Sequence, residues 1–318
     1  MFGKKEQQDN SDEGVLSRLA FASLTEQRRA RRWNIFFKGV FAAYFFLFII
    51  ALYLPAKSDG IAKSNKPHTA LIDVEGVISS ETEASADSII TGLRAAFKAK
   101  KSKAVILRIN SPGGSPVQSG YINDEIYRLK EKYPEKKVYA VITDICASGG
   151  YYIAAAADEI YADKASMVGS IGVLMNGFGF VDTMKKVGVE RRLYTAGDHK
   201  GFLDPFSKAN PDDVKHIKGL LKGIHQQFID TVRKGRGKKL KEDDKLFSGL
   251  IWTGEESVEI GLVDGLGSSS YVARELVKEE KIVDYTPRPT FVDRFAERLG
   301  VSLGSSVIKQ SLSNFQLW

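Results

Sequence analysis

Short apolar runs alternate with amphipathic stretches along most of the chain. The apolar runs are brief and rich in β-branched residues, which predicts buried strands at residues 69–78, 104–109, 138–142 and 159–162. Apolar positions spaced three or four apart predict helices at residues 84–98, 117–130, 181–187 and 211–236. Weaker patterns predict two short strands at residues 191–195 and 262–264, and a helix that begins at a capping box, residues 253–256. Strands that alternate with helices in this way indicate an α/β fold with parallel strand pairing.

One further segment is apolar on every face. Residues 35–54 carry a single charge, Lys38, and twenty helical residues span about 30 Å, enough for a hydrocarbon core. Four arginines at residues 28–32 precede it, which predicts a cytoplasmic N-terminal segment and a translocated remainder. A cleaved signal peptide is the alternative, but residues 54–56 make a poor cleavage site. We therefore expect one transmembrane helix in the lipid bilayer, between a cytoplasmic segment at 1–34 and a linker at 55–68, then a domain at 69–285 and a tail at 286–318.

Charge and cysteine content exclude several classes of function. The 318 residues carry 46 basic and 39 acidic side chains, a net charge of +7, and eight basic and five acidic ones lie within residues 1–38. The rest of the chain is therefore only +4 and lacks the basic patch with interleaved aromatics that binds nucleic acid. Cys146 stands alone, so neither an intrachain disulfide nor a thiolate metal cluster is expected. The composition predicts no cofactor and no metal.

A candidate nucleophile follows the predicted strand at 138–142. The stretch Ala147-Ser148-Gly149-Gly150 is a small-residue turn that leads into an alanine-rich helix, so Ser148 would open that helix. A hydroxyl there lies beside unpaired backbone N–H groups and the positive end of the helix dipole, which stabilise an attacking oxygen and a developing oxyanion. The alternative is an N-cap serine whose glycines serve close packing, and the stretch taken alone favours it.

A serine nucleophile needs a base, and the histidines are the first place to search. His68 falls in the linker, and His216 and His225 fall on the predicted helix at 211–236, which leaves His199. A lysine can serve instead where burial disfavours its charged form. Lys200 lies in a turn after the predicted strand at 191–195, although an ordinary solvated lysine is the alternative.

Glycines after the second predicted strand supply a candidate oxyanion hole. In Asn110-Ser111-Pro112-Gly113-Gly114, two residues without side chains allow backbone N–H groups to face a cavity. A tight structural turn explains the same residues equally well. Ser111 and Ser115 are rival nucleophiles, but neither begins a Gly-Gly, alanine-rich helix.

Five stretches in this order resemble the signal peptide peptidase A family, peptidase family S49, in its short single-copy form. They are NSPGG at 110–114, ASGGYY at 147–152, GSIGV at 169–173, Lys200 after a glycine-containing turn, and SGLIWTG at 248–254 with GLVD at 261–264. The resemblance covers about residues 69–267. It implies a ClpP/crotonase-like fold built from repeated strand-turn-helix units.

The resemblance also implies roles for individual residues. Ser148 would be the nucleophile and Lys200 the general base of a Ser/Lys dyad, with Ser170 holding the lysine amine. Gly113 or Gly114, together with Gly149, would form the oxyanion hole. Family members form rings, octameric in the short form, in which the lysine of one subunit completes the serine site of its neighbour. His199 stands where the family usually has tyrosine, which leaves a share in the base role open to it.

The resulting expectation is a serine endopeptidase anchored in the bacterial inner membrane, with a cytoplasmic N-terminus and a periplasmic catalytic domain. The resemblance implies remnant signal peptides and other apolar peptides as substrates. Two alternatives remain: a crotonase-type acyl-CoA enzyme, for which an outward-facing domain lacks substrate, and a catalytically idle membrane scaffold.

Overall fold

The computed structural model describes residues 26–49, 64–241, 243 and 245–288. The chain forms two compact units: one runs from Asp59 to Pro289, and the other combines Met1–Ser58 with Thr290–Trp318. The described part of the second unit is one helix, Glu26–Ile49, whose mean hydropathy of 1.3 and 24 residues make it long and apolar enough to cross a membrane. The last five residues of the expected span and almost all of the expected tail lie outside the described residues.

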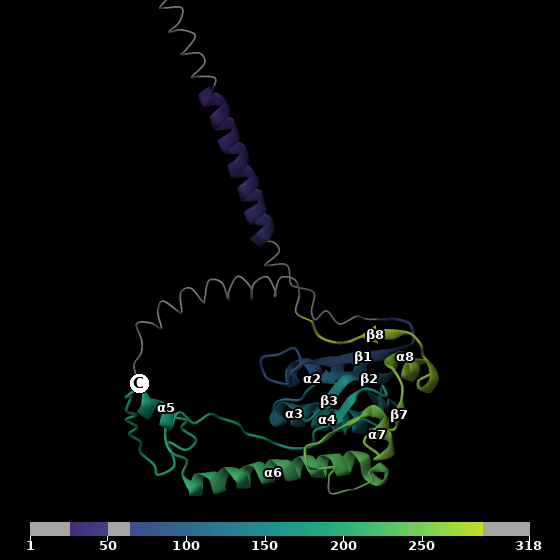
Figure 1. Ribbon diagram of the computed structural model, residues 1–318. Coiled ribbons are helices and arrows are strands. Elements are labelled where there is room, and N and C mark those ends of the chain that lie inside the picture. The colour runs from purple at the N-terminus through teal and green to yellow at the C-terminus, as the bar shows by residue number, and fades with distance from the viewer. Residues whose placement is uncertain (1–25, 50–63, 242, 244, 289–318) are drawn as a thin grey trace, which may run out of the picture. The chain divides into compact units, whose positions relative to one another are not determined.

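The larger unit is built on an eight-stranded sheet with the order β6-β5-β3-β2-β1-β8, in which β4 lies beside β3, and β7 beside β4 (Figure 1). The strands are β1 His68–Glu75, β2 Ser102–Ser111, β3 Val138–Ala147, β4 Glu159–Ala162, β5 Met167–Gly169, β6 Ile251–Thr253, β7 Gly265–Leu266 and β8 Ile282–Asp284. Every pair is parallel except β5 with β6. This mixed α/β sheet agrees with the fold class expected from the alternating pattern.

Helices connect the strands and begin at side-chain caps where the sequence offers them. They are α2 Ala86–Lys98, α3 Pro116–Lys132, α4 Gly149–Ala154, α5 Val181–Lys186, α6 Pro211–Arg236, α7 Gly254–Glu259 and α8 Ser269–Tyr271, with a 3-10 turn η1 Gly237–Lys239 and a π-helical turn η2 Val272–Leu276. Ser115 caps α3, and Asn210 caps α6. The predicted capping box is present, because the side chains of Thr253 and Glu256 each accept from the other's backbone N–H.

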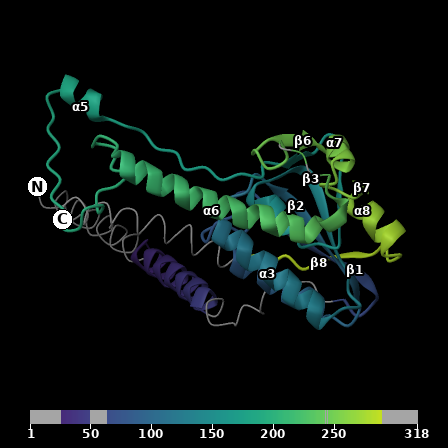
Figure 2. The same cartoon turned by 90° about the horizontal axis from the view of Figure 1, so that it is seen from below.

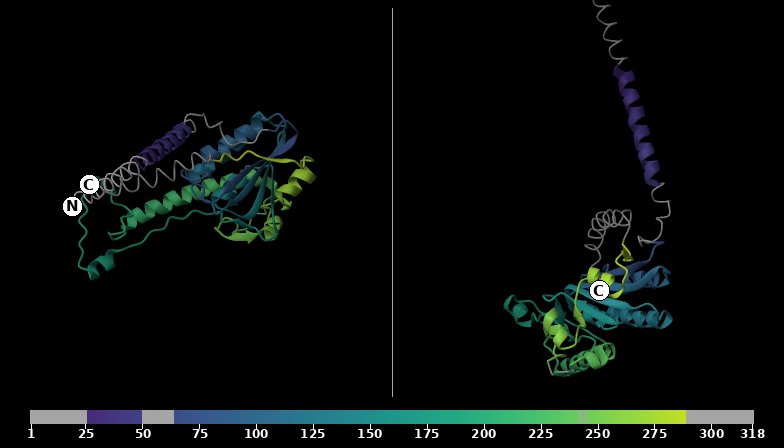
Figure 3. Two further views of the ribbon diagram at one scale, coloured as in Figure 1. Left: turned by 90° about the horizontal axis from the view of Figure 1, so that it is seen from above. Right: turned by 90° about the vertical axis from the view of Figure 1, so that its right-hand side faces the viewer.

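Alternate residues of the central strands face two separate apolar clusters, as the two-residue period of a strand requires. Residues such as Leu107 and Ile142 face the larger cluster, to which α2, α3, α4 and the last third of α6 contribute. Their neighbours Ile106 and Val141 face a smaller cluster that is closed by Val272 and Ala273. Figure 3 shows the sheet from two further sides.

Strand β3 has two different neighbours along one edge. Its residues 139–142 pair with β4, and its residues 145–147 pair with β5. The sheet therefore forks at Thr143 and Asp144, where the partner of β3 changes from β4 to β5. Ser148 follows directly after the part of β3 that pairs with β5. This fork brings the residue after β3 next to the residue after β5.

Residues 174–210, here called the arm, include α5. The arm and the first part of α6 extend away from the sheet (Figures 1 and 2). No residue of the arm is buried. The buried residues of α6 are Phe228, Val232 and Arg236, all in its last third, although its apolar stripe starts at Val214. Most of this stripe is therefore only partly covered by the described part of the chain.

Several sequence expectations need correction. The strand expected at residues 191–195 is wrong, because these residues are exposed on the arm and have no strand beside them to supply hydrogen bonds. The strand expected at 262–264 is displaced toward the C-terminus and forms at β7, Gly265–Leu266. Residues 262 and 263 belong to a turn instead, because the N–H groups of Leu262 and Val263 both donate to the Ser257 carbonyl. His68, expected in the linker, is the fully buried first residue of β1.

Candidate active site

Ser148 lies between β3 and α4 in a backbone conformation that L-residues rarely adopt, with φ 51° and ψ −121°. Its N–H donates to the Gly169 carbonyl at 2.8 Å, and its carbonyl accepts from Tyr152 N at 3.0 Å. Its hydroxyl makes no capping hydrogen bond. The N-cap role that the sequence left open is therefore not what holds this serine. Strain of about 1–3 kcal/mol at a strand-to-helix turn is a feature of exposed nucleophiles.

Glycines allow this turn to approach its neighbours. A Cβ on Gly149 would lie 2.5 Å from Ser119 Oγ, and one on Gly150 would lie 3.1 Å from the Ser111 carbonyl oxygen. Both glycines are buried against α3 and the end of β2. Close packing and the placement of Ser148 thus depend on the same two residues.

The loop after β2 lies directly over Ser148. Gly113 has φ 101°, and a Cβ on it would lie 2.7 Å from Ser148 Cβ and 2.8 Å from Gly149 N. The Gly113 carbonyl accepts from Ile78 N at 2.9 Å, and Ser115 N donates to the Ile78 carbonyl at 2.8 Å, which fixes the loop on both sides of Gly114. Gly113 and Gly114 are therefore neighbours of Ser148 in space, although 34 or more positions separate them from this serine in the sequence.

The two loop glycines differ in what their N–H groups do. Gly113 N–H donates to Ser111 Oγ at 3.1 Å. Gly114 N–H has no acceptor among the described residues, and Gly149 N–H is the first of α4, which a helix leaves without an internal partner. Gly114 N lies 3.2 Å from the place a Cβ on Gly149 would take. Two available N–H groups thus lie close to Ser148.

The rival serines have structural tasks. Ser111 is fully buried and its hydroxyl donates to the Gly76 carbonyl at 2.6 Å while accepting from Gly113. Ser115 Oγ accepts from Gln118 N at the start of α3. The Cys146 thiol, two residues before the candidate nucleophile, is fully buried, and that burial raises its pKa far above the usual value, so it stays a neutral core group.

Ser170 is the residue after β5 and the neighbour of Ser148 across the sheet, because Ala147 pairs with Gly169. It also has φ 51°, and its N–H donates to the Leu250 carbonyl at 2.7 Å. The next carbonyl, that of Ile171, accepts from His225 Nε2 on α6 at 3.2 Å. Ser170 is half-buried and so available to a group that reaches Ser148.

Lys200 is not brought to this cluster by its own chain. It lies on the arm, it is exposed, and its amine has no hydrogen-bond or ion-pair partner among the described residues. His199 beside it is also exposed, and its Nδ1 lies 2.5 Å from Asp213 Oδ1 near the start of α6. One chain therefore assembles Ser148, the glycines and Ser170, and leaves both candidate bases elsewhere.

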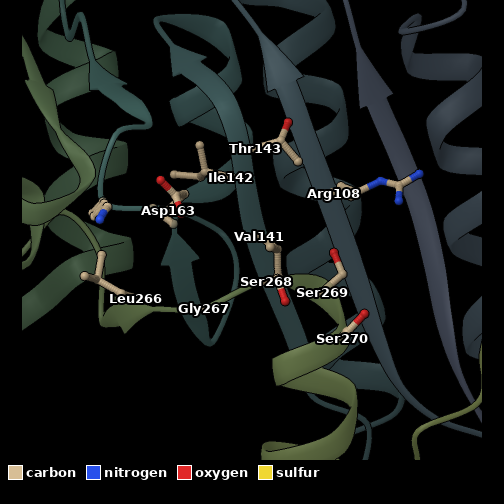
Figure 4. Close-up of a pocket in the computed structure, with 12 residues that line it drawn as sticks. Arg108, Val141, Ile142, Thr143, Asp163, Leu266, Gly267, Ser268, Ser269 and Ser270 are labelled. Carbon is tan, nitrogen blue, oxygen red and sulfur yellow. The ribbon is translucent and has the colours of Figure 1, made fainter.

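A cavity of about 430 Å³ lies apart from this cluster, between the ends of β2, β3 and β4 and the start of α8 (Figure 4). Figure 4 shows Ser268, Ser269 and Ser270 on one side of it and Thr143 and Arg108 on the sheet. The Arg108 guanidinium is held by Asp73 at 2.6 and 2.9 Å. None of the predicted site residues lines this cavity. Among the described residues no group of three His, Cys, Asp or Glu side chains is placed to hold a metal ion.

A half-buried serine at a strained strand-to-helix turn, with free N–H groups beside it, is an arrangement typical of hydrolases that use a serine nucleophile. The sequence profile described as Peptidase family S49 matches residues 130–283. A Synechocystis sp. protein named as a protease is 34% identical over 205 residues, which are 64% of this chain and 72% of that protein. The chain therefore belongs to peptidase family S49, the family of signal peptide peptidase A, whose fold is ClpP-like.

Two further relatives differ in how much of them the chain covers. An Enterococcus faecium protein named as a signal peptide peptidase SppA is 33% identical over 231 residues, 70% of this chain and 66% of that protein. The Na(+)/H(+) antiporter NhaA of Brucella melitensis is 44% identical over 214 residues, which are 67% of this chain but only 29% of the antiporter. The match thus spans less than a third of that protein, and its name says nothing about the matched part.

Two contacts that shape the site were not predicted. Ser111 occupies the Gly113 N–H, and His199 pairs with Asp213 fourteen positions away. A serine directly before Pro-Gly-Gly is a recognisable signal for the first contact, because a hydroxyl there can accept from the N–H two residues on. The second contact crosses from a turn to a helix and has no local signature.

Proposed function

We propose that this chain is a membrane-anchored serine endopeptidase that works as a homo-oligomer. The observation that carries the proposal is Ser148 itself: this serine is strained, its hydroxyl makes no capping bond, and the residue lies close to the N–H groups of Gly114 and Gly149. Membership of a peptidase family supports acyl transfer as the chemistry of this arrangement.

In the proposed reaction Ser148 Oγ attacks the carbonyl carbon of the scissile bond and gives its proton to the neutral amine of Lys200. The N–H groups of Gly114 and Gly149 stabilise the oxyanion of the tetrahedral intermediate. The intermediate collapses when the lysine returns the proton to the leaving amine, and an acyl-enzyme remains on Ser148. Water then attacks the ester, again with Lys200 as base, and the acid is released.

Lys200 reaches the serine of a neighbouring subunit in this proposal. Support comes from the arm, where large apolar side chains are exposed: Leu174 by 80%, Phe178 by 81% and Tyr194 by 88%. A second copy of the chain, packed on the arm and on the partly covered stripe of α6, would bury these groups. It would also remove water from the Lys200 amine, which favours the neutral form of a base. Ser170 would accept from that amine, and a ring of eight subunits is the proposed assembly.

The substrates in this proposal are apolar peptides beside the bilayer, such as remnant signal peptides. Support comes from the apolar helix Glu26–Ile49 and from the Enterococcus relative named as a signal peptide peptidase. The helix would cross the bacterial inner membrane with its arginines in the cytoplasm and the catalytic domain outside.

The test is hydrolysis of an apolar fluorogenic peptide by the full chain in detergent, compared with the variants Ser148→Ala and Lys200→Ala. We expect both variants to be inactive and a fluorophosphonate to label wild type at Ser148. A wild type that neither cleaves peptide nor reacts with the probe would establish an idle scaffold. Full activity of Lys200→Ala would refute the Ser/Lys mechanism.

A further inference from the structure

The turn that carries Lys200 is fixed within itself by backbone contacts. Lys200 N donates to the Gly197 carbonyl and Phe202 N to the His199 carbonyl, both at 3.1 Å. A Cβ on Gly201 would lie 2.8 Å from Leu193 Cδ2, so the far side of the turn is closely packed. These contacts set the shape of the turn but do not set where the turn lies relative to the rest of the chain.

One side-chain contact joins this turn to α6. His199 Nδ1 lies 2.5 Å from Asp213 Oδ1, and within the described part of the chain no other side-chain hydrogen bond or ion pair connects residues 196–201 with that helix. The Asp213 side chain is only 14% exposed, against 66% for His199. Asp213 is not the cap of α6, because Asn210 accepts from Asp212 N in that role. The carboxylate is therefore free to hold the imidazole.

Helix α6 is a rod of 26 residues, about 39 Å long at 1.5 Å per residue. Its last third is anchored in the core through Phe228 and Val232. Its middle borders the surroundings of the candidate nucleophile, because His225 Nε2 donates to the carbonyl of Ile171, the residue after Ser170, at 3.2 Å. A residue that is hydrogen-bonded to the first turn of α6 is thus held by the same rigid helix that borders the serine cluster.

We propose that His199 and Asp213 are a positioning pair that holds the Lys200 turn on α6, so that the lysine meets the serine of the neighbouring subunit at reacting distance. This inference rests on the proposed function. An ionised carboxylate only accepts hydrogen bonds, so the Nδ1–H of the imidazole is the donor. The pair does not touch the reacting atoms. It acts because a misplacement of about 1 Å costs on the order of a hundredfold in rate.

Two amide variants separate this role from that of a base. The side-chain nitrogen of asparagine can replace Nδ1 of histidine, whereas the longer glutamine replaces Nε2, and neither amide takes up a proton. In the full chain we expect His199→Ala and Asp213→Ala each to lower kcat about tenfold to a hundredfold, with KM changed less than about twofold. His199→Asn should restore most of the loss and His199→Gln should not. The double variant should be no worse than either single one, since both remove the same bond.

His216→Ala is the matched control, because His216 is an exposed histidine on the same helix, and its kcat should equal that of wild type. The subunit number of each variant, measured by native mass spectrometry, should be unchanged. A wild-type kcat for His199→Ala, with Lys200→Ala inactive, would overturn the positioning role alone. A His199→Asn variant as impaired as His199→Ala would overturn it too, because the ring itself would then be required. An active Lys200→Ala would instead refute the proposed dyad.

Discussion

Mixing two inactive variants tests whether the site is shared between subunits. Ser148→Ala keeps the lysine and Lys200→Ala keeps the serine, so neither forms a complete dyad alone. In a ring of head-to-tail contacts each site takes its serine from one subunit and its lysine from the next. At equal amounts and random order, the serine is intact in half of the sites and the lysine in half of those. We therefore expect about a quarter of wild-type activity from two preparations that have none.

The assay is co-expression of the two full-length variants with different tags, tandem purification, and peptide hydrolysis at several ratios. Shared sites make the activity rise and fall with the product of the two fractions, and reach a maximum at equal amounts. Wild type mixed with the double variant is the control, since equal amounts give about a quarter of full activity for shared sites and about a half for sites within one chain. No recovery at any ratio, with the control at a half, would refute the shared site.

Three further predictions concern single residues. Gly113→Ala places a Cβ 2.7 Å from Ser148 Cβ and should abolish hydrolysis and probe labelling, whereas Gly120→Ala, which meets nothing within 4 Å, should match wild type. Lys136→Met removes a buried amine that donates to three carbonyls at the end of α2, so thermal melting should show a loss of about 1–3 kcal/mol with activity retained at low temperature. The hydrogen bond from Arg128 lowers the pKa of Glu125 to about 2, so Glu125 stabilises the fold at neutral pH and loses this effect as the pH falls from about 4.5 to about 2. Glu125→Gln should lower the melting temperature at pH 7, and a difference from wild type that persists near pH 2 would contradict this.

The regular elements could be predicted because their partners are local or lie in the same sheet. The strand Glu159–Ala162 and the helix Pro211–Arg236 form at their expected bounds. The failure at residues 191–195 has the opposite cause: the apolar side chains there lie on the exposed arm, and what they pack against is not supplied by the described chain. A pattern of apolar residues indicates that their side chains are buried, but it does not indicate whether the same chain or another molecule covers them.

The site residues also differ in whether their positions follow from the sheet or from contacts of the arm. The resemblance implied that Gly113 or Gly114 and Gly149 lie with Ser148, and in the structure these residues are neighbours because the parallel strands β2 and β3 end at the same edge of the sheet. The choice between Gly113 and Gly114 stayed open until the structure showed that Ser111 Oγ accepts from the Gly113 N–H, while the Gly114 N–H has no acceptor among the described residues. The contact of His199 with Asp213 likewise depends on how the arm returns to α6.

In the proposed dyad the serine and the lysine come from different subunits, and this would decide when the chain is active. The strain at Ser148 and the free N–H groups beside it are already present in one chain, so this half of the site needs no rearrangement. The lysine half is exposed on the arm, and one chain does not bring it to the serine cluster. In the proposed assembly the same apolar contact that covers the arm would also desolvate the amine. A newly made chain would thus have no peptidase activity until it meets its neighbours, which would keep an unassembled copy from cleaving proteins in the membrane.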